Sequence, residues 1–299
     1  MAVERESLFQ AEEIFRQGVQ SPLRRLWIVL GLTCNRRIQI GLILIMFWVL
    51  VAFLAPFIAP HGPEEVFQGD KRLKPLDKYW LGTDQFGRDL LSRILYGAKY
   101  ELLIGIISTT GAVFIGIGLG AIAGFYGGGL DQVIMRIMDL LFAFPSFILA
   151  LIFAGVLGSG VVNLILSLIL VSIPIYARLI RGEILQHKRR QYADAAVVTG
   201  CSKNRVLVHH LLLNSLNPVI TQLPMTISWV ILTAAGISYL GFGIQPPAPE
   251  WGLMINEGSN YIVSGDWWIS FFPGIALFTL LLGFSLLGDG LNESLYARG

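Results

Sequence analysis

Long runs without a charged side chain constrain this chain more than any other feature. Five of them occur, at Ile38 to His61, Leu102 to Leu130, Leu140 to Ala177, Val206 to Pro249 and Trp267 to Gly288. A bilayer core of about 30 Å needs about 20 consecutive apolar residues for one helix. Only 14% of the residues are charged, whereas an ordinary globular domain has about 25%. The runs therefore predict an all-α membrane protein.

The third run is too long for a single span. Small and polar residues gather near its middle, where they favour a turn. These residues are Gly155, Gly158, Ser159, Gly160 and Asn163. A split there predicts six transmembrane helices, near 38–60, 101–125, 131–157, 161–180, 214–241 and 266–288.

The distribution of Lys and Arg predicts the orientation, because basic residues are retained on the cytoplasmic side. An even number of spans places both termini on one side. Basic residues are frequent in the N-terminal tail and after the fourth predicted span, and none occurs from Val206 to Ala297. The segment from Lys71 to Lys99 is also basic, but acidic residues accompany it. We therefore expect both termini in the cytoplasm.

This topology predicts how the chain is organised. The parts are a cytoplasmic tail at 1–37, a first span at 38–60, an extracytoplasmic segment at 61–100, a transmembrane domain at 101–290 with a cytoplasmic loop at 181–213, and a cytoplasmic tail at 291–299. Apolar residues in the first tail could form an amphipathic helix on the inner leaflet. An ordinary leader helix without a specific task explains them equally well.

Several other classes of function find little support. The net charge of +2 sums basic inner loops and mixed-charge outer loops, so it does not indicate nucleic-acid binding. His187, His209 and His210 lack the spacing of a zinc enzyme, and we expect no metal site. Cys34 and Cys201 are both expected on the cytoplasmic side, where disulfides are rare. No series of acids or histidines crosses the predicted bilayer, which argues against a proton-coupled carrier.

Inside the predicted spans, glycine and proline carry the local information. Gly116, Gly120 and Gly124 repeat every four residues, which favours close packing by another helix over lining a path. Arg136 and Asp139 lie three residues apart and are expected to pair with each other. The prolines are expected to interrupt the third, fourth and fifth helices, either as gating bends or as static kinks. They are Pro145, Pro174, Pro218 and Pro224.

The segment LGTDQFGRDLLSR, from Leu81 to Arg93, reads as a glycine turn followed by a helix start. Thr83 or Asp84 can accept hydrogen bonds from free backbone N–H groups there. Arg88 has Asp84 four residues earlier as a partner. Structural residues of this signature are expected to be Gly82, Thr83, Asp84, Gly87, Arg88 and Asp89.

This segment resembles the signature of dipeptide/oligopeptide/nickel ABC importer permeases, of the second-permease type. Three further strings agree in order and spacing: GFYGG from Gly124, LGFGIQPPAPEWG from Leu240, and GDGL from Gly288. The similarity covers about residues 38–292. It implies a type I importer permease fold in the inner membrane of a bacterium.

The resemblance also implies a coupling loop. In this importer superfamily the sequence of the cytoplasmic permease loop resembles a pattern: E-A-A, three residues, G, nine residues, then I-x-L-P. Here Asp194, Ala195 and Ala196 are followed at the same spacing by Gly200, although Asp replaces Glu and the terminal proline is missing. Small alanines suit entry into a groove, and glycine permits a tight turn. A bulky residue at Ala196 or Gly200 should therefore block docking on an ATPase; an ordinary amphipathic loop is the alternative.

The segment from Gln245 to Asp266 is expected outside the membrane. Its aromatic residues suggest a short helix near 250–263 that lies flat at the interface. The resemblance implies that this side meets a substrate-binding protein, although anchoring of the last two spans is as good an explanation. Possible contact residues are Pro246, Pro247, Glu250 and Trp251.

No phosphate-binding G-x-x-x-x-G-K-[ST] loop occurs, so ATP must be hydrolysed by other subunits. The resemblance implies a non-enzymatic permease that works by alternating access with a homologous second permease, two ATPases holding ATP and Mg²⁺, and an external binding protein. Dipeptides or short oligopeptides are the expected cargo, with nickel chelates and glutathione as alternatives. An ion-gradient-driven carrier or channel is the alternative from a different class. The sequence does not identify the pathway residues.

Overall fold

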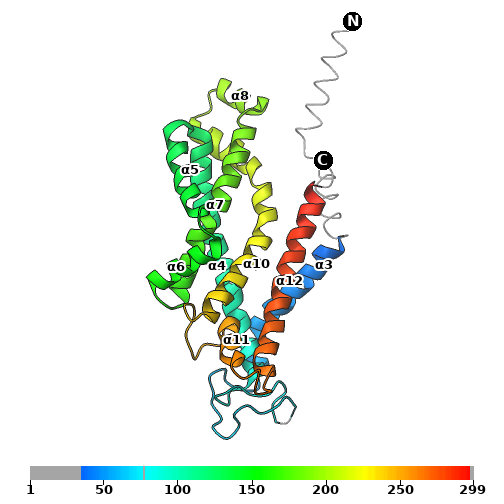
Figure 1. The fold of residues 1–299 in the computed structure, drawn as a ribbon. Coiled ribbons are helices and arrows are strands. Elements are labelled where there is room, and N and C mark those ends of the chain that lie inside the picture. The colour runs from blue at the N-terminus through cyan, green and yellow to red at the C-terminus, as the bar shows by residue number, and fades with distance from the viewer. Residues whose placement is uncertain (1–34, 77, 297–299) are drawn as a thin grey trace.

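A computed structural model describes residues 35–76 and 78–296 (Figure 1). The amphipathic helix expected in the tail at 1–37 falls almost entirely outside these ranges, as does Cys34. Within them the chain is helical and has no strand, apart from one bridge between Thr83 and Asp89. The prediction of an all-α chain is therefore confirmed.

The helices follow the uncharged runs, with short helices between them. In chain order they are α3 (Arg36–Ile58), α4 (Leu90–Tyr126), α5 (Gly128–Phe142), α6 (Ser146–Leu157), α7 (Val161–His187), α8 (Gln191–Val198), α9 (Lys203–Arg205), the π-helical turn η1 (Val206–Leu212), the 3₁₀ turn η2 (Leu213–Ser215), α10 (Asn217–Tyr239), α11 (Trp251–Ser259) and α12 (Trp268–Tyr296).

Five of these helices are long and apolar enough to cross a membrane, namely α3, α4, α7, α10 and α12. The expected third span at 131–157 is not one helix. It consists of α5 and α6, which meet at an angle of 92°. Pro145 precedes α6, and because proline lacks an N–H and restricts the residue before it, the helix breaks there.

The other prolines do not interrupt their helices. Pro174 and Pro224 lie inside the continuous helices α7 and α10, and Pro218 lies in the first turn of α10. A first-turn proline loses no helical hydrogen bond, since the N–H groups there have no partner within the helix. Pro174 and Pro224 therefore leave α7 and α10 unbroken, and Pro218 marks the beginning of α10 inside the span expected at 214–241.

Close packing between α4 and α7 forms the centre of one half of the bundle. A Cβ atom on Gly116 would lie 2.6 Å from Tyr176 Cβ, and one on Gly120 would lie 2.3 Å from the Ala177 carbonyl oxygen. Only glycine allows backbones this close. The predicted packing role of this glycine face is confirmed. In the other half, α12 lies along α3 and α10 (Figure 1).

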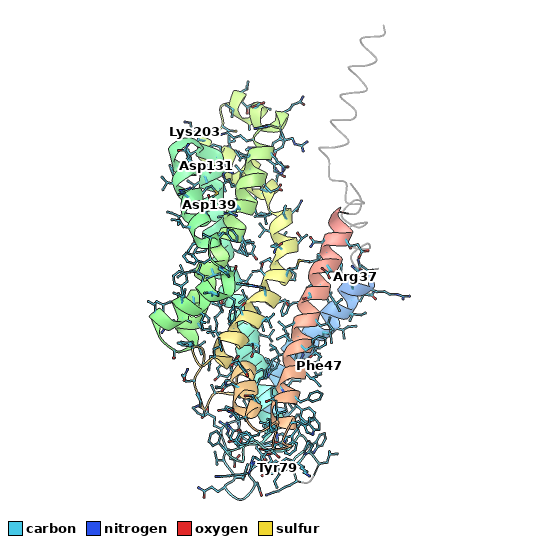
Figure 2. The ribbon with its side chains drawn as sticks, in the orientation of Figure 1. Arg37, Phe47, Tyr79, Asp131, Asp139 and Lys203 are labelled. Atoms are coloured by element: carbon cyan, nitrogen blue, oxygen red, sulfur yellow. The ribbon has the colours of Figure 1, made fainter. Side chains whose placement is uncertain are left out.

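The bundle has two distinct ends (Figure 1). We call the end formed by residues 59–89 and 240–266 the loop end, and the end formed by 187–216 the α8 end. The beginning of α3 and the end of α12 point toward the α8 end. In Figure 2 the labelled Tyr79 lies in the loop end, whereas Asp131 and Lys203 lie near the α8 end. Residues that carry the sequence signatures are found at both.

Candidate functional site

The turn from Gly82 to Asp89 is held by its own side chains. The Thr83 hydroxyl donates to the Asp70 carbonyl and accepts from Leu73 N at 2.9 Å. Gly82 and Gly87 both have positive φ, at 81° and 86°. A Cβ on Gly87 would lie only 2.2 Å from the Phe67 carbonyl oxygen. Glycine is thus required at this position by conformation and by space.

The helix cap differs from the one expected. Asp89, not Thr83 or Asp84, is the N-cap of α4, and its carboxylate accepts from the Ser92 N–H and hydroxyl. Asp84 instead accepts from the Phe86 and Arg88 N–H groups inside the turn. The signature therefore uses one aspartate to close the turn and the next to begin the helix.

Four charges join this turn to α11, three of them buried and the fourth, Glu257, 11% exposed. Arg88 forms ion pairs with Asp84, as expected, and with Glu257 Oε2 at 2.8 Å. Arg93, fully buried, lies 3.7 Å from Asp84 Oδ2 and 3.6 Å from Glu257 Oε2. Two guanidinium groups thus balance two carboxylates away from solvent, where loss of one partner is strongly destabilising.

Arg93 also connects segments that are distant in the sequence. Its Nη1 donates to the carbonyl oxygens of Pro63 and Pro247, both at 3.1 Å. A planar guanidinium can serve several acceptors at once. The beginning of α4 is in this way tied both to the loop after α3 and to the loop before α11.

A pair of buried carboxyl groups lies between α4 and α11. Glu250 is the N-cap of α11 and accepts from the N–H groups of Gly252 at 3.0 Å and Leu253 at 2.6 Å. Glu101 Oε1 accepts from Trp251 N at 3.1 Å. Burial raises the pKa of Glu250 to about 7, despite the hydrogen bonds that favour its charged form. A proton is therefore retained more readily at this junction than at a solvent-exposed glutamate.

Two residues expected to face a binding protein lie inside the chain. Glu250 and Trp251 are completely buried. The Trp251 indole donates to the Ile94 carbonyl at 3.1 Å and packs edge-on against Trp48, with ring centroids 4.8 Å apart. Their side chains are unavailable to a partner, so that interpretation was wrong for both. Pro246 and Pro247 are exposed and remain accessible.

The expected surface helix is α11 at Trp251–Ser259, shorter than the predicted 250–263. Its position differs as well, because the indoles of Trp251 and Trp268 belong to the hydrophobic core. Trp267 alone of the three tryptophans at 251, 267 and 268 is exposed. Packing against α4 and α12 outweighs the interfacial preference of the aromatic rings.

Three residues of the expected coupling loop, Asp194, Ala195 and Ala196, lie in the short helix α8. Gly200 follows it with φ of 82°, its N–H donates to Val197 O, and the Cys201 N–H donates to Ala196 O. This pair of bonds is a Schellman motif, which glycine favours because it adopts positive φ without strain. The predicted tight turn at Gly200 is present, and nothing lies within 4 Å of where a Cβ would be.

One face of α8 is buried and the other is open. Ala193 and Ala196 pack into the core formed with η1, so a bulky residue at Ala196 would disturb this chain itself. Asp194 and Ala195 are exposed. Two side chains that were not singled out from the sequence, Val197 and Val198, are 62% and 86% exposed. Their position three and four residues after Asp194 is the signal that could have identified them.

Ion pairs connect α5 to α7 near the α8 end. Asp131 accepts two hydrogen bonds from Arg181, and Asp139 pairs with Arg178 (Figure 2 labels both aspartates). The expected pair of Arg136 with Asp139 was wrong. The reason is that α7 presents a second arginine beside Asp139, which sequence spacing within one helix cannot reveal.

Sequence reasoning missed three charged residues at the junction of α4 with α11: Arg93, Glu101 and Glu257. Each is separated from at least one of its partners by about 150 positions or more, as in the Glu101–Trp251 bond. The available signal is that Glu101 directly precedes an uncharged run, where an acid requires a partner. In the described ranges, no group of three His, Cys, Asp or Glu residues could hold a metal ion.

Comparison with known proteins agrees with this architecture. Residues 116–298 match the family described as binding-protein-dependent transport system inner membrane component. Residues 21–75 match the N-terminal TM domain of oligopeptide transport permease C.

Curated relatives cover nearly the whole chain. A dipeptide transport system permease protein of Alkalihalophilus pseudofirmus is 38% identical, over 87% of this chain and 86% of the relative. A glutathione transport system permease protein of Pectobacterium atrosepticum is 38% identical, over 93% and 92%. A di/tripeptide transport system permease protein of Pseudomonas aeruginosa is 37% identical, over 92% of each chain. The chain therefore belongs to the binding-protein-dependent transport system inner membrane components, as a multi-pass permease of a bacterial ABC importer.

Proposed function

We propose that this permease carries dipeptides or short oligopeptides through an ATP-driven importer. The observation that carries the proposal is its 38% identity with a dipeptide system permease along most of both chains. The match to an oligopeptide permease N-terminal domain supports the same cargo. Glutathione, itself a small peptide, is the second candidate, because a glutathione system permease is equally similar. Nickel chelates remain a third option from the resemblance alone.

The α8 end is proposed to face the cytoplasm, with both termini on that side. The basic residues around α8 support this orientation, because such residues are retained inside. They include Arg178, Arg181, Lys188, Arg189, Arg190, Lys203 and Arg205. The beginning of α3 and the end of α12 both point the same way (Figure 1). The loop end then faces the extracytoplasmic side, where Pro246 and Pro247 are offered to a binding protein.

The open face of α8 is proposed to dock into a groove of an ATPase subunit. Asp194 and Ala195 supply a charge and a small side chain, and Val197 and Val198 supply apolar surface. Exposed valines on a short helix are otherwise unfavourable in water, which supports a covering partner. Gly200 contributes by ending the helix abruptly rather than by touching the ATPase.

The functional complex is proposed to contain a second, homologous permease, two ATPases and a binding protein, all embedded in or attached to the lipid bilayer. ATP and Mg²⁺ belong to the ATPases, and this chain holds no cofactor. Closure of the ATPases would move α8 and switch the bundle between two states that differ in their ligand contacts.

The test is reconstitution in liposomes with a labelled dipeptide. The complete set of subunits should take up the dipeptide only with external binding protein and ATP. Val198→Asp should abolish uptake by releasing the ATPases, while the permease itself still folds in the membrane. Val66→Asp changes an exposed valine of the loop end and is the matched control. It should leave the contact between α8 and the ATPase intact. Uptake driven by an ion gradient with this chain alone would favour a carrier and overturn the proposal.

A further inference from the structure

A groove runs between the first membrane helix α3 and the outer part of α4. Its volume is about 490 Å³, within the roughly 300–1,000 Å³ range of ligand pockets. Its lining residues come from both helices and are mostly apolar. They are Val49, Ala52, Phe53 and Pro56 from α3, and Tyr96, Lys99, Leu102 and Ile106 from α4.

The groove lies on membrane-spanning surface. Both helices pass the length and hydropathy requirements of a span. Phe53, which lines the groove, is 76% exposed, and Phe57 one turn later is 81% exposed. Nothing in the described ranges of this chain covers these rings. The surface around the groove is therefore of the kind that contacts hydrocarbon.

Lys99 is the charged residue among those that line the groove. Its side chain is exposed, and its ammonium group forms no ion pair or hydrogen bond with any residue in the ranges 35–76 and 78–296. Three residues later the uncharged run of α4 begins at Leu102. A lysine at such a boundary lays its methylene stem along apolar surface and holds its ammonium at the level of the headgroups.

We propose that the α3–α4 groove binds an anionic phospholipid. The phosphate lies at Lys99 Nζ, with the Tyr96 hydroxyl one turn nearer the loop end as a second donor. One acyl chain extends from there along Leu102 and Ile106, against Val49 and Ala52. The bound lipid fills the groove that α3 leaves beside α4 and so helps to fix the first helix on the transport domain.

Charge complementarity favours a lipid over a protein helix as the occupant. A helix of the second permease would have to bring a carboxylate to Lys99 at the edge of the hydrocarbon, where ionised side chains are expensive. An anionic headgroup is already present at that depth. Because both groups are charged, loss of the lysine should weaken binding by about fivefold, the effect of one basic residue near an anionic surface.

The test uses the intact transporter in nanodiscs of phosphatidylcholine. A minor fraction of phosphatidylglycerol carries a photoreactive diazirine in its acyl chain, and crosslinked peptides are identified by mass spectrometry. The expected labels lie in peptides that contain Ala52 and Leu102. Lys99→Gln should lower this labelling about fivefold, and Ala52→Phe, which fills the groove, should lower it at least as much.

Lys71→Gln is the matched control, since it removes the same charge from an exposed site of the loop end. It should leave the labelling unchanged. ATPase activity of the assembled complex shows that each variant is folded; if Ala52→Phe does not assemble, Lys99→Gln decides alone. Equal labelling of wild type and Lys99→Gln, or equal labelling by diazirine phosphatidylcholine, would overturn the proposal. So would crosslinks to the second permease from a photoreactive amino acid placed at position 53.

Discussion

The loop end and the α8 end both carry strings typical of the family, but they use them in opposite ways. At the loop end the charged signature residues Asp84, Arg88 and Asp89 are buried. Arg88 pairs with Asp84 and with Glu257 of α11, and Asp89 caps α4 through Ser92. At the α8 end Asp194, Ala195 and Gly200 are exposed, and their neighbours Val197 and Val198 are open to a partner. A signature string therefore does not by itself indicate a contact surface.

The difference has a physical origin. Buried charges are stable only when paired, so the loop end must satisfy each of them inside the chain. A short helix with small side chains buries little surface of its own and gains stability from a partner. The loop end is built as an internal junction, whereas α8 keeps an open face on which we propose that the ATPase docks.

The sharpest test of this contrast is Arg88→Ala. Removal of the guanidinium leaves Asp84 and Glu257 short of positive charge in a buried site, which should lower the free energy of unfolding by about 3–5 kcal/mol. Arg72→Ala is the control, because Arg72 is half-exposed in its pair with Asp266 and should matter by at most about 1 kcal/mol. Denaturant titration of the purified complex measures both. Equal losses would show that the loop-end charges are not an internal junction.

A second test uses pH at the Glu250 carboxyl. Burial raises its pKa from 4.5 to about 7, so in that window the folded state holds a proton that the unfolded state has released. The contribution of this carboxyl to the free energy of unfolding is therefore fully present below pH 4.5. It falls as the pH rises from 4.5 to about 7, and it does not change further above that pH. Glu250→Gln remains neutral, so its advantage in stability over wild type should grow from nothing near pH 4.5 to about 3 kcal/mol near pH 7.

Thermal unfolding of both proteins from pH 4 to pH 8 measures that difference. The Glu101 carboxyl and the Ser238 hydroxyl are the polar side chains facing Glu250, beside the N–H groups of Gly252 and Leu253. Ser238→Ala therefore serves as the control that leaves the acid in place. A difference between wild type and Glu250→Gln that does not change with pH would contradict a protonated junction.

Gly200→Ala should have a smaller effect. Alanine at φ of 82° is strained by about 1 kcal/mol, which loosens the end of α8 and should reduce ATP-driven uptake. Gly182→Ala is the matched control, because Gly182 is helical with open space around it and alanine there should stabilise by about 0.5–1 kcal/mol. If both variants changed stability in the same direction, the Schellman turn at Gly200 would not be what fixes the end of α8.

Val198→Ser should change stability least, by within about 0.5 kcal/mol, because the side chain is 86% exposed. It should nevertheless reduce copurification of the ATPases with the permease. Val66→Ser at the loop end is the control for the loss of an exposed valine. Undiminished ATPase binding would show that the open face of α8 is not the docking surface.

The sequence by itself determined that this protein lies in a membrane, that it is helical, and to which family it belongs. Each of these follows from local properties: the length of uncharged runs, glycine spacing, and strings read in order. The packing of the Gly116 face and the turn at Gly200 also followed, since both depend on what glycine permits within a few residues.

Only the tertiary structure decided which residues face inward. The 92° break between α5 and α6, the pairing of Asp139 with Arg178, and the burial of Glu250 and Trp251 all depend on neighbours far along the chain. Burial and electrostatic pairing are set by those neighbours, and α4 meets α11 across about 150 positions, as at Glu101 and Trp251. A string of letters records which groups are present; the packing of helices determines which of them remain free for a partner.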